Sequence, residues 1–178
     1  MSSERENGPI KDMVNKVADT FGGAVGQVSA AVVSTPDGFV ESAAIGDRYE
    51  IAAGRIALAR SRNPQVQQLA RQMIVDHTTN THHLLAALEM NETRGVAPPP
   101  DGLDTRRETM IRHLEESRDE VFDVNYLDQQ VLAHEETVTL MKSYGARGEN
   151  VQLRALAQGA APVVERHLAH VKRVRAGL

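Results

Sequence analysis

Four long stretches of the sequence carry apolar residues at helical spacing, and each series is interrupted near its middle by one ionisable residue. In the third stretch, apolar residues from Val124 to Met141 recur every three or four positions, with His134 at the centre. The four interrupting residues are Glu50, His77, His134 and His167. A charge on an apolar seam is costly to bury unless it finds a partner. We therefore expect the four residues to face one another or water.

Proline, glycine and capping residues divide the chain into helices. Residues 1–9 are polar, end in Gly-Pro, and are predicted to form a disordered tail. Asp37 is a candidate cap for the first bundle helix, whereas Asn63 caps the second, with Pro64 in its first position. The predicted helices span residues 10–33, 39–61, 65–91, 104–116, 119–144 and 149–175.

Residues 38–176 are predicted to form one all-α domain. Short connections join 39–61 to 65–91, and 119–144 to 149–175, as two antiparallel hairpins. The connection between the hairpins is long enough to cross the bundle, and it contains the short helix 104–116. This pattern is typical of a ferritin-like antiparallel four-helix bundle with a long crossover. An up-down bundle with a decorated loop is the alternative.

The appended segment 10–33 is predicted to be an amphipathic helix. Its apolar face is too continuous to stay in water, so we expect it to pack on the bundle or on a second copy of the chain, as a homo-oligomer contact. Three glycines, Gly22, Gly23 and Gly26, weaken the helix by about 1 kcal/mol each relative to alanine. A membrane-surface helix is the alternative, although Lys11 and Lys16 are its only cations.

Composition excludes several classes of protein. A net charge of −4 and a pI near 6.0 give no electrostatic attraction to nucleic acid. Because the chain has no cysteine, any metal must be held by histidine and carboxylate. The sequence shows no secretory signal and no apolar run of about 20 residues, which predicts a cytoplasmic protein without a transmembrane segment.

The known catalytic patterns are also missing from the sequence. Di-iron bundles carry a Glu three residues before a His, and no histidine of this chain has one. There is no nucleophile elbow, phosphate-binding loop or dinucleotide fingerprint. The sequence therefore favours a protein that is not an enzyme.

Three of the seam residues are predicted to share one layer of the bundle. Glu50, His77 and His134 lie about equally far from the turns at the ends of their helices. His167 is expected about 7 Å farther along at ~1.5 Å per residue, unless a kink at Pro162 corrects the offset.

Two interpretations of this layer stay open. In the first, Glu50 bonds His77 and His134 in a polar layer that fixes helix register. In the second, the layer binds a divalent transition metal such as zinc, copper, nickel or iron through Glu50, His77, His134 and His167. The alternate ligands are Asp76, Glu135, Tyr126 and Asp128; of these, Asp128 and Tyr126 lie at the height expected for His167. Three other histidines, His82, His83 and His113, are predicted to be solvated.

Several phrases of the sequence resemble a known family. They include FVESAAIGDRYEIAAGRIALARS, LARQMIVDHTTNTHHLLAAL, FDVNYLDQQVLAHEETVTLM and APVVERHLAHVK. The most specific elements are Asp76-His77, the block from Phe122 to Tyr126 followed by His134-Glu135, and Pro162 with His167. These residues resemble the bacterial ferritin-like family filed as domain of unknown function 4142, over residues 38–175. The resemblance implies a four-helix bundle with no established activity, and many relatives look exported.

The function predicted first is a non-enzymatic helical bundle that acts in stress physiology or as an interaction module. The alternative is a metal-binding accessory protein that uses histidine and glutamate in the bundle interior. Stoichiometric metal in the purified protein separates the two.

Overall fold

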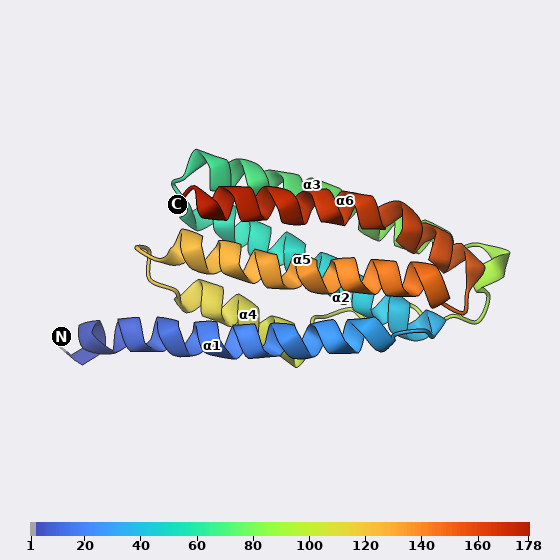
Figure 1. Cartoon of the computed structure of the whole chain (residues 1–178), viewed down its shortest axis with the longest axis horizontal. Helices are drawn as coiled ribbons and strands as arrows, with labels where there is room; N and C mark the ends of the chain where they lie inside the picture. Colours follow the sequence, from blue (N-terminus) through green and yellow to red (C-terminus); the bar gives the residue numbers. More distant parts are fainter. Residues whose placement is uncertain (1–2) are drawn as a thin grey trace.

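The computed structural model describes the backbone of residues 3–178 and the side chains from residue 8 onward. All regular elements in this part of the chain are helical (Figure 1). They are α1 (Ser3–Val32), α2 (Pro36–Arg60), α3 (Pro64–Leu88), the 3-10 helix η1 (Asn91–Thr93), α4 (Thr105–Glu116), α5 (Phe122–Arg147) and α6 (Val151–Ala176). The all-α prediction is confirmed.

Local sequence fixes where the bundle helices begin. Asn63 caps α3 by accepting a hydrogen bond from the Gln65 backbone N–H at 2.9 Å, as predicted, and Pro64 takes the first position. The prediction that Asp37 caps α2 is wrong, because the Thr35 hydroxyl accepts from the Gly38 N–H. Asp37 instead accepts from the backbone of Ala97, at 2.9 Å, and so ties the crossover to the start of α2.

The crossover topology is confirmed by the contacts at the two ends of the bundle. At one end, Arg60 near the end of α2 donates to the backbone carbonyl of Ser117, at 2.6 Å, just before α5. At the other end, Asn150 before α6 donates to the carbonyl of Glu92, at 2.6 Å, just after α3. The connection between α3 and α5 therefore returns along the whole bundle. The up-down alternative is wrong.

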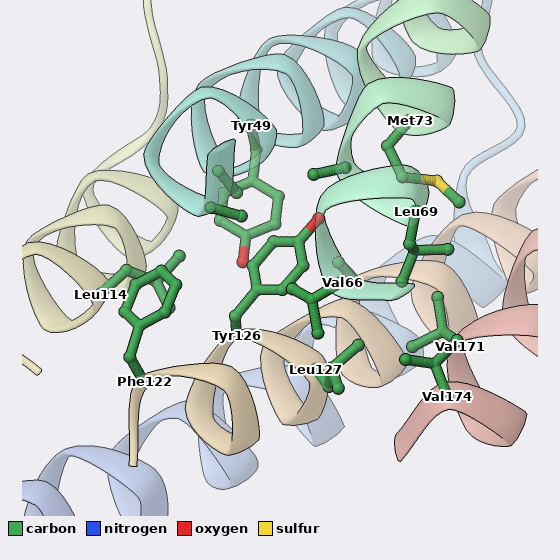
Figure 2. Close-up of a cluster of buried hydrophobic side chains, with 14 of the residues drawn as sticks. Tyr49, Val66, Leu69, Met73, Leu114, Phe122, Tyr126, Leu127, Val171 and Val174 are labelled. Carbon is green, nitrogen blue, oxygen red and sulfur yellow. The ribbon is translucent and has the colours of Figure 1, made fainter. Parts of the chain in front are cut away.

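Two hydrophobic clusters fill the bundle, one toward each end. The cluster around Tyr126 draws on α2, α3, α4, α5 and α6, and includes Tyr49, Leu69, Leu114 and Val171 (Figure 2). The second cluster lies toward the α5–α6 turn, where the rings of Phe39 and Tyr144 stack at a centroid distance of 4.1 Å. Between the clusters the four helices carry the ionisable seam residues, so the polar layer is bounded by apolar packing on both sides.

Helix α1 begins earlier than the sequence predicts. The expected tail covered residues 1–9, of which residues 1–2 lie outside the described part of the chain and residues 3–9 belong to α1. The Gly-Pro pair at 8–9 does not mark the boundary, because α1 continues through Pro9. As expected, α1 packs on the bundle, where it lies along α5 and α4 (Figure 1).

The face by which α1 packs is the opposite of the one predicted. Its apolar residues point away from the bundle and are between half and three-quarters exposed: Ile10, Met13, Val14, Val17, Phe21, Val25, Val28 and Val32. The contact face is polar instead. Asp12 pairs with Arg118 at 2.7 Å, and Asp19 accepts from His113 at 2.7 Å. His113 is therefore not solvated, in contrast to the prediction, whereas His82 and His83 are exposed.

Two of the α1 glycines permit this close docking. A Cβ atom at Gly23 would lie 3.0 Å from the Leu132 side chain of α5, and one at Gly26 would collide with the Glu136 carboxylate. The glycines that weaken the helix therefore let it approach α5. None of the helices in residues 3–178 combines the length and the apolar character that a membrane crossing requires.

Candidate metal centre

Three histidines from three helices meet in the layer between the hydrophobic clusters. The ring centroids of His77 on α3 and His134 on α5 are 5.6 Å apart, and each lies 5.7 Å from that of His167 on α6. All three side chains are buried, with relative exposures of 1–4%. Glu50 on α2 joins them, since its Oε1 lies 3.5 Å from His134 Nδ1. The prediction that Glu50, His77 and His134 share a layer is confirmed.

His167 belongs to the same layer, although its predicted height differed. Helix α5 extends to Arg147 and α6 begins only at Val151, so the turn lies farther from His134 and nearer to His167 than the sequence indicates. This change brings the two histidines to similar heights along the bundle. Pairing of His167 with Asp128 or Tyr126 is therefore wrong.

One ring nitrogen of each histidine is held by an acceptor outside the cluster. His77 Nδ1 donates to the Asp47 carboxylate at 2.8 Å, and His167 Nε2 donates to the Asp76 carboxylate at 2.8 Å. His134 Nδ1 donates to the backbone carbonyl of Gln130 at 2.9 Å. Because a carboxylate or a carbonyl can only accept, each neutral ring carries its proton on this outer nitrogen. Its other nitrogen then presents a lone pair.

These lone-pair nitrogens lack a protein partner. Among the described residues, no group bonds His77 Nε2, His134 Nε2 or His167 Nδ1, although all three atoms are buried. A ligand atom from each histidine lies within 4.8 Å of those from the other two. With metal–nitrogen bonds of about 2.0–2.1 Å, three imidazoles around one ion have ring centres roughly 5–5.5 Å apart. The observed triangle is wider by only a few tenths of an ångström, so the residues fit a metal ion.

The Glu50 carboxylate is the second group that the protein leaves unsatisfied. Neither of its oxygens accepts a hydrogen bond from the described residues, although the side chain is only 1% exposed. Leaving a buried polar group unpaired costs about 1–3 kcal/mol, and more when it is charged. The polar-layer interpretation required Glu50 to bond His77 and His134. Instead His77 bonds Asp47, and Glu50 makes only the long contact with His134.

The protonation of the three rings depends on their surroundings. Burial lowers the pKa of His134 to about 3, and the nearby charge of His77 contributes to the shift. Burial also lowers the pKa of His167 to about 4, with His134 and His77 adding repulsion. For His77, burial acts in the same direction but is outweighed by the Asp47 hydrogen bond and by Glu50, so its pKa is raised. Burial raises the pKa of Glu50. At neutral pH His134 and His167 are therefore ready to act as ligands.

Acid should destabilise the metal-free protein. The folded-state pKa values of His134 and His167 are lower than the ordinary value of 6.5, so the unfolded chain takes up their protons first as the pH falls. The contribution of these two rings is full above about pH 6.5 and is lost toward pH 4, at roughly 1.4 kcal/mol per pH unit for each proton. Glu50, whose pKa is raised, opposes part of this loss, because the folded protein takes up its proton before the unfolded chain does. The raised pKa of His77 acts in another window: its contribution is full below about pH 6.5 and is lost as the pH rises above that value. Urea unfolding in chelator at several pH values gives the slope of the unfolding free energy against pH.

A histidine variant distinguishes the pH dependence caused by the buried histidines from that caused by carboxylates on the surface. His134→Leu removes one of the two titrating rings, so its stability should depend less steeply on pH by up to about one proton. An unchanged slope in the variant would show that His134 is not the group that takes up the proton.

The alternate ligands predicted from the sequence lie elsewhere or act differently. Asp76 accepts a hydrogen bond from the outer nitrogen of His167, and the cluster of potential ligand atoms is formed by the three histidines without it. Glu135 pairs with Lys172, and Asp128 pairs with Arg175 at 2.7 Å, both away from the layer. Tyr126 is buried in the neighbouring hydrophobic cluster (Figure 2). None of these four completes the histidine triangle.

Sequence reasoning missed Asp47, which is buried and fully hydrogen-bonded. Its carboxylate accepts from His77 and, through both oxygens, from the Asn80 amide at 2.8 and 3.1 Å, and from the Thr81 hydroxyl at 3.3 Å. The signal was available, because Asp47 precedes Glu50 by three residues and so lies one helical turn away on the same side of α2.

A groove between α3 and α6 gives the cluster access to solvent. Its volume is about 610 Å³, and His77, His167 and Asp76 line it together with Asn80 on the α3 side. Next to His167, the α6 side is mostly apolar, with Leu156, Ala160, Val163 and Val164. His134 and Glu50 do not line it. An ion that arrives through the groove would therefore meet His77 and His167 first.

Comparison with known proteins places the chain in a family. Residues 24–174 match the family model described as domain of unknown function (DUF4142), and the protein belongs to this family of helical domains. No curated protein matches the sequence.

A solved structure with a similar fold is that of "CopM in the Cu(II)-bound form". The TM-score is 0.67 at 16% sequence identity, and the match covers 82% of this chain and 99% of that one. At this identity the similarity concerns the fold.

Proposed function

We propose that the protein binds one divalent transition-metal ion in the bundle interior, with His77, His134 and His167 as ligands and Glu50 as the adjoining carboxylate. One observation carries the proposal: three buried lone-pair nitrogens converge, while the other nitrogen of each ring is bonded to an acceptor. Metal-bound histidines in proteins nearly always have such an outer acceptor, which fixes the ring and raises its basicity.

Charge balance supports a divalent ion. The carboxylates of Glu50, Asp47 and Asp76 surround the histidine triangle and would offset the charge of the ion, so the buried cluster would not carry a large uncompensated charge. Metal binding would also displace the proton that His77 tends to hold in the metal-free protein. A bound ion would engage the three ring nitrogens and a Glu50 oxygen, none of which is bonded by a described protein group.

The donor set favours copper(II) or zinc over softer or harder ions. Imidazole nitrogen suits zinc, copper, nickel and iron, and copper(II) binds most tightly among the divalent first-row metals. The donors include no thiolate, since the chain has no cysteine, so nothing in the cluster favours copper(I). The Cu(II)-bound state named for the similar structure makes copper(II) the first ion to test. The role would be to hold or carry the ion without catalysis.

The test is metal stoichiometry with matched histidine variants. The purified full chain is stripped with chelator, loaded separately with copper(II) and zinc, desalted and analysed for metal. We expect one ion per chain for the wild type and for His82→Ala, whose histidine is exposed. His134→Ala should lose the ion, and the copper(II) resonance spectrum of the wild type should show several nitrogen ligands. Equal metal content in the two variants, or none in the wild type, would overturn the proposal.

A further inference from the structure

The outward face of α1 is an apolar surface that the bundle does not cover. Eight large apolar side chains lie on it, from Ile10 to Val32, and each is at least 50% exposed. Phe21 is 73% exposed and Val17 is 65% exposed. Single exposed apolar residues are common on proteins, but a contiguous row along one helix marks an interaction site. In Figure 1, α1 runs along the lower edge of the molecule, and the helices that it contacts, α4 and α5, lie above it.

The spacing of this face is that of a coiled-coil seam. Apolar residues alternate at intervals of four and three through Ile10, Val14, Val17, Phe21, Ala24, Val28 and Ala31. This is the heptad pattern, in which a helix packs against another helix of the same spacing. The bundle uses none of these positions except Ala31, which is half-buried. The repeat is therefore left for a helix from outside this chain.

Among the α1 residues whose side chains are described, from residue 8 onward, every ionisable residue pairs with the bundle. From residue 10 onward its ionisable residues are Lys11, Asp12, Lys16 and Asp19. Lys11 pairs with Glu116 at 3.0 Å and Lys16 with Asp128 at 2.6 Å. Asp12 and Asp19 pair with Arg118 and His113, as described above. From residue 8 to Val32, the outward face thus has neither a positive rim that would attract an anionic membrane nor a charge pattern that would select a charged partner.

We propose that the outward face of α1 binds the same face of a second copy of this chain, as a symmetric dimer. A symmetric interface places one patch on both subunits, so the patch must be complementary to itself, and an uncharged apolar heptad seam meets this condition. A standard interface buries about 800 Å² on each partner, and a row of eight large apolar side chains, each at least half exposed, offers a surface for contact of this kind. The surface lies apart from the histidine cluster, so the dimer does not depend on metal.

The test is the oligomeric state of the full chain and of two charge variants. Val17→Glu combined with Phe21→Glu places carboxylates at the middle of the seam, where burial against an apolar face is costly. The control is Ser29→Glu, which adds a carboxylate at an exposed position on the side of α1. By sedimentation we expect the wild type and Ser29→Glu at twice the chain mass of 19.5 kDa, and the double variant at the chain mass. All three should keep the same helical circular dichroism, because the changed side chains are exposed.

Cysteine cross-linking gives a second readout, because the chain contains no cysteine. Phe21→Cys should form a disulfide-linked dimer on mild oxidation, since Phe21 lies near the middle of the seam and meets its own copy in either helix orientation. Ser29→Cys should not. A wild type that stays monomeric when concentrated overturns the proposal. If that monomer also floats with vesicles of phosphatidylcholine and phosphatidylglycerol, and the double variant does not, the face binds membranes. A double variant that remains dimeric places the interface elsewhere and overturns it too.

Discussion

Replacing His134 with leucine should change stability in opposite directions without and with metal. In chelator, His134→Leu should melt at or above the wild-type temperature, because it removes a buried ring whose Nε2 has no partner and completes an apolar seam. In saturating copper(II) or zinc, the wild type should gain about 4 kcal/mol at a thousandfold excess of free ion over the dissociation constant. For a chain of this length that gain corresponds to roughly 8–16 °C in melting temperature. The variant should gain almost nothing.

The control for this experiment is His82→Ala, an exposed histidine outside the cluster. Its melting temperature should equal that of the wild type both in chelator and in metal. This result would distinguish metal binding in the buried layer from nonspecific binding by surface histidines. If neither metal nor chelator changes the melting temperature of the wild type, and the leucine variant is stable, the layer is a buried polar layer and not a metal site.

The fold could be predicted because periodicity and helix caps are local properties. The apolar residues around His134 have the three- and four-residue spacing of a helix, and Asn63-Pro64 marks the start of α3. The layer followed from the same information, since equal distances from a turn place Glu50 and His77 at one height. The height of His167 was misjudged because it depends on where α5 ends, and helix ends are poorly marked in this turn.

The orientation of α1 could not be predicted, because it depends on partners that are distant in the sequence. An amphipathic helix buries its apolar face only when the rest of the protein offers no stronger contacts to its polar face. Here Arg118, His113 and Gln129 pair with carboxylates on the polar face of α1. Glycines on that face also allow a close approach to α5. The apolar face was then left outward, which is the basis for the dimer proposed above.

The acceptors around the histidines were only partly readable from the sequence. Asp76 was noted as an alternate ligand because it precedes His77, but it bonds His167 on another helix. Asp47 was overlooked although it lies one helical turn before Glu50, because its partners His77 and Asn80 on α3 reach it only through the packing of the two helices. Side-chain contacts between helices depend on rotation about each helix axis, which a hydrophobic seam defines only approximately.

Removing the Asp47 carboxylate should strongly destabilise the metal-free protein. Asp47→Leu leaves the buried His77 Nδ1–H without an acceptor and removes the negative charge that raises the His77 pKa. It also leaves the Asn80 amide without its acceptor. Breaking a buried pair by removing one partner costs about 3–5 kcal/mol. We expect a fall of that size in the free energy of unfolding, measured by urea titration in chelator.

Asp76→Leu is the matched variant, because Asp76 also accepts from a ring of the cluster but its side chain is 36% exposed. Water can replace that acceptor, so the loss of stability should be about 1 kcal/mol or less. Both carboxylates orient a ligand ring, so both variants should weaken metal affinity by about 10–100-fold. Equal losses of stability in the two variants would show that the cost of removing an acceptor does not depend on how deeply that acceptor is buried. Unchanged metal affinity in both variants would mean that the carboxylates do not orient the rings for an ion, and the case for a metal centre would then lack its main structural support.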